Sequence, residues 1–324
     1  MNERGPTKNI MRKILYLALL LLLLISAAVA QLPKYKIALN VLQDQKTDDY
    51  EVYTMNPDGT GMTNVTKNKD VAWTYHSIPG KLLFISDRGA CKRCYFLYES
   101  SLNGENIRKI SDLQLEDSWM GSRNNGKELI VAGRVASTLR FQLFTIDRAT
   151  GTYKQLTNEP TSAFRDPTFS PDGKRIVYVY KKTRTDRSEI EEMYIMNADG
   201  TNRKKLTTYP ANDPLGKEPS YKVGPPHWNA KEKFITYQSN QAGKQSIYAV
   251  TPDGKKQWKL TDSKLDEGWH DWSPDGKWLA FDSRDETTGR YDLMLMNYKT
   301  KEVKNLTTSS TFKYHQSPVF VSAK

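Results

Sequence analysis

The sequence predicts an all-β fold, a six-bladed β-propeller of four-stranded blades. The first observation is a repeat, because a hydrophobic residue followed by Thr or Ser recurs at intervals of 45, 46, 50, 54 and 46 residues, a period typical of arrays of one structural unit. The second is that Pro-Asp-Gly and Asp-Gly pairs separate short β-prone runs, as in hairpin turns, where Gly accepts a positive φ. The closing pairs of the repeat are Val65-Thr66, Ile110-Ser111, Leu156-Thr157, Leu206-Thr207, Leu260-Thr261 and Leu306-Thr307.

The unit from Asp166 to Thr207 shows the order of elements within one repeat. Four short strands joined by tight turns and one polar loop are typical of a propeller blade, and we call them strands a to d. In this unit they are strand a up to Phe169, the turn 171–173, strand b at 175–180, the polar loop, strand c at 193–197, the turn 199–200 and strand d at 203–207.

The two ends of the chain supply the third observation. Segments 35–40, 50–56 and 61–66 have the pattern of strands b, c and d with no strand a before them, and the lone segment 316–320 has the pattern of a strand a. We therefore expect the C-terminal strand to pair with the N-terminal strands in one mixed blade. This pairing closes the ring and leaves no free sheet edge.

The first thirty residues do not follow the repeat. Basic residues precede a run of twelve apolar residues at 14–25, and Ala28-Val29-Ala30 provides a small-x-small cleavage site. This pattern is typical of a secretory signal peptide, and the run is shorter than the roughly 20 residues of a membrane-spanning helix. We expect residues 1–30 to be removed, so that residues 31–324 form the propeller, with no second domain and no membrane span after cleavage.

The strings at residues 169–174, 194–201 and 272–281 resemble the TolB-type, WD40-like propeller repeat, and the resemblance covers the chain after the leader. It implies the fold but no single function, because this repeat occurs in proteins with different roles. TolB itself has a separate α/β domain before its propeller, whereas strand b of the first blade begins here within a few residues of Gln31, so TolB's role is not carried over. Prolyl-oligopeptidase relatives add an α/β-hydrolase domain, and this chain has no Gly-x-Ser-x-Gly motif.

The loops between strands b and c are long and varied, whereas the a–b and c–d turns are short. These b–c loops share one face with the d–a connections, and binding residues concentrate on variable loops held by a rigid scaffold. Trp73, Trp119 and Trp269 each stand seven residues before the Gly of an a–b turn, so we expect them at one level of that face. Indole rings there would stack on a sugar or hold a peptide. The alternative is that they pack between blades as core.

Arg88, Arg284 and Asp271 complete the expected ligand-binding set. Arg88 and Arg284 follow strand b in two blades, where a guanidinium would bind a ligand carboxylate in bidentate fashion. The recurrence of an Asp before each Arg also favours a structural role in tying neighbouring blades together. Asp271 stands five residues before its turn Gly, at the same phase as His227 one blade earlier.

The four histidines all stand where a blade begins. We expect His76 to pack in the core, because aromatic residues fill its phase in other blades. His227, His270 and His315 would supply ligands for a divalent metal near the channel mouth. Oligogalacturonate lyases, another propeller family, have a histidine-ligated metal of that kind, but their His-x-His pattern is missing here. A protein without a cofactor and a protein with a divalent metal are both left open.

Cys91 and Cys94 are the two cysteines of the chain. In an exported protein we expect them to form a disulfide, which stabilises little because the loop that it closes is short. A redox-active pair would need a helix N-terminus, and these residues lie between strands.

We predict an exported, non-catalytic propeller that binds an envelope protein or an anionic glycan through its loop-rich face. We expect a monomer in the periplasm or outside the cell, with no nucleic-acid partner. The formal charge of +11 suits an acidic partner, although charges spread over every blade favour an ordinary solvated surface. The alternative is a metal-dependent lyase or hydrolase of uronate polysaccharides on the same propeller.

Overall fold

The structure is a computed structural model, which describes residues 35–209, 223–261 and 264–322. The expected signal peptide, residues 1–30, lies outside the described residues. Tyr35–Lys324 forms one compact unit. Within the described ranges, no helix has the length and the apolar character needed to cross a membrane.

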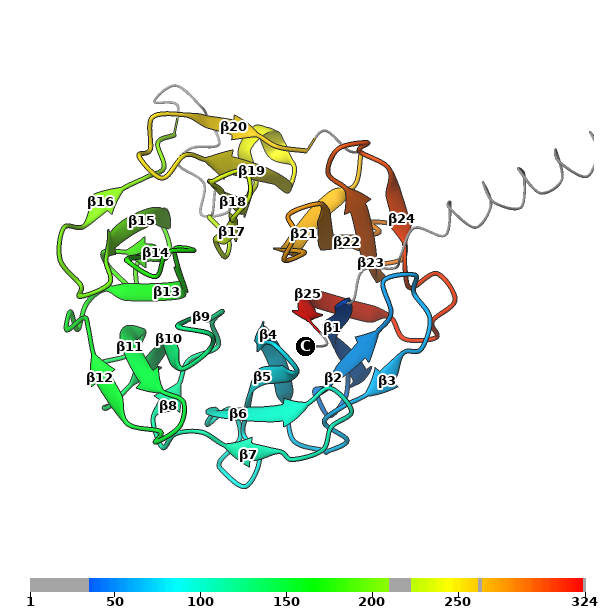
Figure 1. Cartoon of the computed structure of the whole chain (residues 1–324), viewed down its shortest axis with the longest axis horizontal. Coiled ribbons are helices and arrows are strands. Elements are labelled where there is room, and N and C mark those ends of the chain that lie inside the picture. Colours follow the sequence, from blue (N-terminus) through cyan, green and yellow to red (C-terminus); the bar gives the residue numbers. More distant parts are fainter. Residues whose placement is uncertain (1–34, 210–222, 262–263, 323–324) are drawn as a thin grey trace, which may run out of the picture. The chain divides into compact units, whose positions relative to one another are not determined.

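The compact unit is built of antiparallel sheets whose strands follow one another in chain order. Figure 1 shows these sheets arranged in a ring, with one edge strand of each four-stranded sheet towards the centre and the other at the periphery. The protein is therefore an all-β propeller with four-stranded blades, as the sequence predicts.

Three sheets contain four strands each, in the order a to d. The first contains β4 (Ala72–Ile78), β5 (Lys81–Ser86), β6 (Phe96–Ser101) and β7 (Arg108–Lys109). The second contains β13 (Ala163–Phe169), β14 (Arg175–Lys181), β15 (Glu192–Asn197) and β16 (Lys204–Lys205). The third contains β17 (His227–Asn229), β18 (Phe234–Ser239), β19 (Ser246–Val250) and β20 (Gln257–Lys259), with the short helix η2 (Gln241–Gly243) between β18 and β19.

A five-stranded sheet departs from this pattern because its strand a is split in two. Both inner segments pair with the same strand b, and residues 116–120 leave the sheet between them. The strands are β8 (Gln114–Leu115), β9 (Gly121–Arg123), β10 (Glu128–Arg134), β11 (Gln142–Asp147) and β12 (Tyr153–Gln155).

An eight-stranded sheet contains two successive meanders. A single parallel bridge, Tyr291 to Tyr314, joins them. The first meander is β21 (Asp266–Trp272), β22 (Trp278–Arg284), β23 (Tyr291–Asn297) and β24 (Val303–Asn305). The second is β25 (Tyr314–Ser322), β1 (Tyr35–Asp44), β2 (Asp49–Met55) and β3 (Thr63–Asn64).

The C-terminal strand β25 pairs antiparallel with β1, with Val319 opposite Ala38 and Phe320 opposite Ile37. The expected pairing of the two ends of the chain is thus present. It aligns a strand a from the end of the sequence with strands b, c and d from its beginning.

Burial falls from the inner to the outer strands. Strands b and c are apolar runs such as 82–85 in β5, whose four residues are all 0% exposed, because each blade packs between two others and both faces of its sheet are covered. Strand d is polar: Arg108–Lys109 and Lys204–Lys205 are exposed. The hydrophobic core therefore lies between adjacent blades.

The c–d turns pack against the preceding blade. Gly104 has φ +84°, and a Cβ added there would lie 2.2 Å from the carbonyl oxygen of Val65. A Cβ added at Gly151 would lie at the same distance from the carbonyl oxygen of Ile110, and a Cβ added at Gly59 would overlap the carbonyl oxygen of Leu306. In these repeats the closing hydrophobic residue thus lies against the glycine turn of the next blade.

Four of the inner strands contain a β-bulge at the same level. The pairing register shifts between Thr74 and His76 in β4, between Arg165 and Thr168 in β13, and between Glu267 and His270 in β21. In β25 the shift follows Gln316. A bulge inserts an extra residue and redirects side chains, and these bulges lie where the candidate site forms.

Candidate functional site

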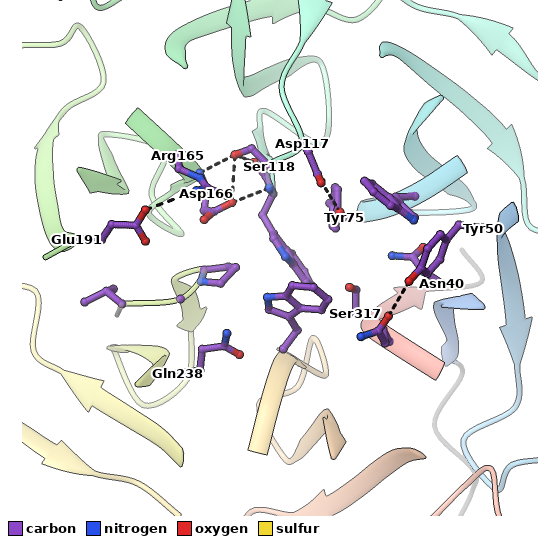
Figure 2. Close-up of a pocket in the computed structure, with 17 residues that line it drawn as sticks. Asn40, Tyr50, Tyr75, Asp117, Ser118, Arg165, Asp166, Glu191, Gln238 and Ser317 are labelled. Atoms are coloured by element: carbon purple, nitrogen blue, oxygen red, sulfur yellow. Dashed lines mark hydrogen bonds and ion pairs between the residues drawn. The ribbon is translucent and has the colours of Figure 1, made fainter. Parts of the chain in front are cut away.

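A pocket of about 250 Å³ lies among the inner strands (Figure 2), and we call it the mouth pocket. It is lined by the early residues of strands a, next to the d–a connections, which places it at the loop-rich face. Side chains from every sheet contribute, so no single blade forms it. The lining residues are Asn40, Tyr50, Trp73, Tyr75, Asp117, Ser118, Trp119, Arg165, Asp166, Glu191, Val223, Gly224, Pro225, Gln238, Trp269, Gln316 and Ser317.

The bulges supply several of these residues. Four lining residues lie at the register shifts of the bulges and have no paired residue on the neighbouring strand: Tyr75, Asp166, Trp269 and Ser317. Asp166 and Ser317 have φ near +52°, a region that non-glycine residues adopt rarely. The backbone is therefore bent at these positions, and the side chains reach the pocket.

All three predicted tryptophans line the mouth pocket. Trp73 and Trp119 are buried, at 9% and 6% exposed, whereas Trp269 is partly exposed and packs against the same core cluster. The structure therefore brings the three indoles to one pocket and makes two of them core residues as well. Their role in ligand binding stays a prediction.

Aromatic rings form a continuous wall on one side of the pocket. Ring centroids are 5.2 Å apart for Tyr50 and Trp73, 6.5 Å for Trp73 and Tyr75, and 5.3 Å for Tyr75 and Trp119. The guanidinium of Arg93 lies 5.0 Å from the centroid of Trp73, a cation–π contact. A large apolar surface thus faces the pocket beside polar groups.

The polar groups of the pocket carry more negative than positive charge. The pocket contains three acidic residues, Asp117, Asp166 and Glu191, and one basic residue, Arg165. Arg165 Nη1 lies 3.5 Å from Glu191 Oε1. Burial lowers the pKa of Arg165, but the carboxylates of Asp166, Glu191 and Asp117 outweigh it and raise the pKa above its ordinary value. The pocket is therefore acidic, in contrast to the formal charge of +11 of the whole chain.

Asp117 is held beside the aromatic wall. Its carboxylate accepts a hydrogen bond of 2.7 Å from the hydroxyl of Tyr75 (Figure 2). Burial raises the pKa of Asp117, and the hydrogen bond from Tyr75 and the charge of Arg165 oppose that rise. Burial also raises the pKa of Tyr75 well above its usual value, so Tyr75 stays a donor.

Asp166 has a structural role in the pocket. Its carboxylate accepts hydrogen bonds from the backbone of Trp119 at 2.9 Å and from the hydroxyl of Ser118 at 3.1 Å, and its own backbone donates to Ser118 at 2.7 Å. These bonds join strand a of one blade to the split strand of the preceding blade. Asp166 therefore positions Trp119.

Three buried polar atoms of the pocket have no hydrogen-bond partner within the part of the chain that the structure describes. They are Trp119 Nε1 and Arg165 Nε, which are donors, and Gln238 Oε1, an acceptor. Leaving such groups unpaired costs free energy. A ligand with both acceptors and donors, such as a peptide, would satisfy them.

Asp271 lines a second pocket of about 550 Å³ at the a–b turns, which we call the base pocket. Tyr75, Trp119 and Asp166 line both pockets. The Asp271 carboxylate accepts from the backbone of Phe320 at 2.8 Å and lies 3.5 Å from His227 Nδ1. The structure thus places Asp271 outside the mouth pocket, in a contact between blades.

Of the three candidate metal ligands, the structure brings His227 and His270 together, and their role as ligands stays a prediction. The rings of His227 and His270 lie 4.8 Å apart, but His270 bonds Thr236 Oγ1 at 2.9 Å, and His315 bonds Ser310 Oγ at 2.8 Å and the carbonyl of Tyr291 at 3.0 Å. Burial lowers the pKa of His270 and of His315. Among the described residues, no group of three or more His, Cys, Asp or Glu has the geometry of a metal site.

His76 also lines the base pocket. Its Nε2 lies 2.8 Å from Ser122 Oγ, and burial lowers the pKa of His76 to about 4. The imidazole is therefore neutral and packs against the next blade, close to the expectation of a core residue.

The two predicted arginines lie outside both pockets. Arg88 donates to the carbonyl of Thr66 in the preceding blade at 3.3 Å, and its guanidinium lies over Tyr98, which agrees with the blade-tying alternative. Arg284 is exposed at the end of β22. Cys91 and Cys94 form a disulfide with Cα atoms 5.2 Å apart, in the loop before β6.

Sequence reasoning missed the charged and amide residues of the mouth pocket. Asp166 stands seven residues before Gly173 and Pro225 seven before Glu232, the same phase as the three tryptophans, so the repeat could have identified both. Asp117, Glu191 and Gln238 follow no such phase, because they lie in connections and at the end of a strand b. No sequence signal marks them.

Comparisons with known proteins agree with this fold. The family model of the TolB beta propeller domain matches residues 167–321. The Tol-Pal system protein TolB of Francisella tularensis subsp. mediasiatica is 22% identical over 289 residues, which is 84% of this chain and 62% of the relative. The chain thus spans less than two thirds of the length of that curated relative.

Solved structures show the same architecture. TolB from Acinetobacter baumannii superposes with a TM-score of 0.68 at 16% identity, over 88% of this chain and 66% of that one. An oligogalacturonate lyase in complex with manganese superposes with a TM-score of 0.52 at 15% identity, over 84% and 78% of the two chains. At such identities the likeness shows the fold alone. Residues 167–321 thus match the TolB beta propeller domain family, and the curated relatives and the solved structures resemble this chain in the same propeller.

Proposed function

We propose that this protein is an exported, non-catalytic propeller that binds a protein partner in the bacterial envelope through the mouth pocket. The observation that carries the proposal is the combination of an aromatic wall with three buried, unpartnered polar atoms, two donors and one acceptor. Interfaces concentrate binding energy in such desolvated aromatic and arginine positions.

A protein segment fits the pocket better than a glycan. An anionic glycan would bring carboxylates next to Asp117, Asp166 and Glu191, and like charges at short range are unfavourable. A peptide backbone supplies carbonyl acceptors for Trp119 Nε1 and Arg165 Nε and an N–H donor for Gln238 Oε1. The similarity to the Tol-Pal system protein TolB supports an envelope protein as partner.

Export is part of the same proposal. The basic, apolar and small-x-small segments of residues 1–30 would direct the chain across the membrane and be removed, which leaves a monomeric propeller in the periplasm or outside the cell. The Cys91–Cys94 disulfide is consistent with an oxidising compartment.

We also propose that the ring has six blades. The eight-stranded sheet would count as two blades, because only the Tyr291–Tyr314 bridge joins its two meanders, and each meander repeats strands a to d. The other four sheets would supply one blade each.

Site-specific photo-crosslinking in intact cells tests the proposed function. A photoreactive amino acid at Arg284, exposed on the loop-rich face, is expected to capture a defined protein partner. The same amino acid at Lys277, exposed in an a–b turn of the same blade, serves as the control. Equal capture from both positions, or none from Arg284 and other loop positions of its face, would contradict the proposal.

A further inference from the structure

We propose that the mouth pocket recognises a positively charged side chain, Lys or Arg, in an extended segment of the partner. This inference rests on the proposed function and names the chemistry that the pocket selects. It reverses the expectation from overall composition, because a chain with a formal charge of +11 would select an acidic partner.

The local charge of the mouth pocket is negative. The pocket holds three carboxylates and one guanidinium. Asp166 is occupied by the backbone and hydroxyl donors that fix Trp119. Asp117 bonds one hydroxyl, that of Tyr75, and Glu191 makes a loose 3.5 Å contact with Arg165. Asp117 and Glu191 therefore keep acceptor capacity for a ligand cation.

The aromatic wall of the mouth pocket also suits a cation. Cations bind over indole faces, and this chain already places the guanidinium of Arg93 over Trp73. Trp119 and Trp269 also line the pocket, and Trp269 is the partly exposed one. A Lys or Arg side chain would lay its apolar stem along these rings and extend its charged end towards the carboxylates.

The unpaired polar atoms of the mouth pocket suit a basic peptide better than a small cation. Gln238 Oε1 needs a donor, whereas Trp119 Nε1 and Arg165 Nε need acceptors. An ammonium or guanidinium supplies the donor, and the carbonyls of its own backbone supply the acceptors. A metal ion or a free amine would leave both donors unpaired. A cavity of about 250 Å³ is also below the usual range of about 300–1,000 Å³ for drug-sized ligands, so it suits one side chain with its backbone.

Selection from a library of random peptides displayed on phage tests the inference. The mature propeller is expected to enrich peptides with a Lys or Arg at one position, whose binding is lost in the Trp269→Ala variant. Replacing that basic residue by Gln is expected to weaken binding at least about tenfold, which corresponds to about 1.4 kcal/mol.

Two neighbouring glutamates provide a matched pair of variants. Glu191→Gln, in the pocket, is expected to reduce the preference for the basic peptide about tenfold or more. Glu192→Gln removes a charge next to it that pairs with Lys205 and lies outside the pocket, so it is expected to leave binding unchanged. A preference that survives both Glu191→Gln and Asp117→Asn overturns the inference.

The outcomes also separate this inference from the function on which it rests. Peptides that depend on Trp269 but tolerate Lys→Gln contradict the recognition of a cation and leave the protein-binding role standing. If no selected peptide depends on Trp269, the mouth pocket does not bind peptides, and both proposals are wrong.

Discussion

Asp282 shows how a single buried carboxylate organises the mouth of this propeller. It is 2% exposed and accepts hydrogen bonds from the backbone of Ser317 at 2.9 Å and of Trp269 at 3.1 Å. Both donors belong to bulges that line the pocket. Asp282 thus positions the exposed tryptophan and ties two blades together, and burial raises its pKa to about 7.

This raised pKa predicts a pH dependence of stability. Between pH 3.8 and about pH 7 the folded chain holds a proton on Asp282 that the unfolded chain, with a pKa near 3.8, has released. The contribution of Asp282 to the free energy of unfolding therefore increases as the pH falls from about 8 to about 5. It is lost as the pH rises through 7. When the pH falls from about 8 to about 5, the free energy of unfolding of the wild type is expected to increase by about 2 kcal/mol relative to that of the Asp282→Asn variant.

Urea unfolding of both proteins at several pH values measures the difference. Histidines with lowered pKa, such as His76 and His270, titrate with the opposite sign but are present in both proteins and cancel. A difference that does not change with pH would show that Asp282 is already ionised at pH 5.

At the residue scale, the sequence predicts the aromatic part of the site and not its charge. Trp73, Trp119 and Trp269 share a repeat phase, and the structure brings them to one pocket. Asp117, Glu191 and Gln238 reach it from connections with no common phase, and Asp271 and His315 lie in contacts elsewhere. The position of a residue within the repeat predicts its level along the strand, but packing between distant parts of the chain decides which side chains meet in the pocket.

At the element scale, the close approach of a c–d turn to the preceding blade is the recurrent contact. Gly104 and Gly89 both have positive φ, but a Cβ at Gly104 meets the carbonyl oxygen of Val65, whereas nothing lies within 4 Å at Gly89. The two glycines therefore separate the cost of backbone strain from the cost of steric overlap.

Gly89→Ala is expected to cost about 1–2 kcal/mol of unfolding free energy, from the left-handed conformation alone. Gly104→Ala adds overpacking of about 1–3 kcal/mol and is expected to cost about 3 kcal/mol or more. Chemical denaturation of the two variants gives the comparison. Equal losses would mean that the blades separate at this contact without penalty.

The turns and strands follow from the sequence, but the bulges do not. Short β-prone runs and Asp-Gly pairs predict strands b to d and their hairpins well. A bulge shifts the register by one residue and keeps the composition of the strand, so 163–169 and 266–272 look like regular strands. The bulges matter because they direct Asp166 and Trp269 into the pocket.

At the scale of the whole molecule, pairing of β25 with β1 connects the two ends of the chain. Phe320 is 4% exposed and packs with Ile37 and Leu39 of β1, and its ring meets that of Tyr35 edge-on at 6.5 Å. The closing contact is thus both hydrogen-bonded and apolar.

Phe320→Ala is expected to lower the unfolding free energy by about 3–5 kcal/mol, as for other buried phenylalanines. Val303→Ala, on the exposed strand d of the neighbouring meander at 37% exposed, is expected to change it by less than about 0.5 kcal/mol. Thermal and urea unfolding measure both. A small loss for Phe320→Ala would mean that the ring is stable without this contact.

The formal charge of the whole molecule differs in sign from the charge of the mouth pocket. Its formal charge of +11 suggests an acidic partner, yet the pocket lined by every sheet holds three carboxylates and one arginine. Composition averages over the surface, whereas binding depends on the few groups that surround the ligand.

The central claim, that a protein partner binds at the mouth pocket, is tested most directly by calorimetry with the crosslinked partner once it is identified. Trp269→Ala is expected to weaken binding at least about tenfold, whereas Trp258→Ala, a partly buried tryptophan of the outer strand β20, leaves the affinity unchanged, and circular dichroism confirms that both variants are folded. An unchanged affinity in a folded Trp269→Ala variant would contradict the claim.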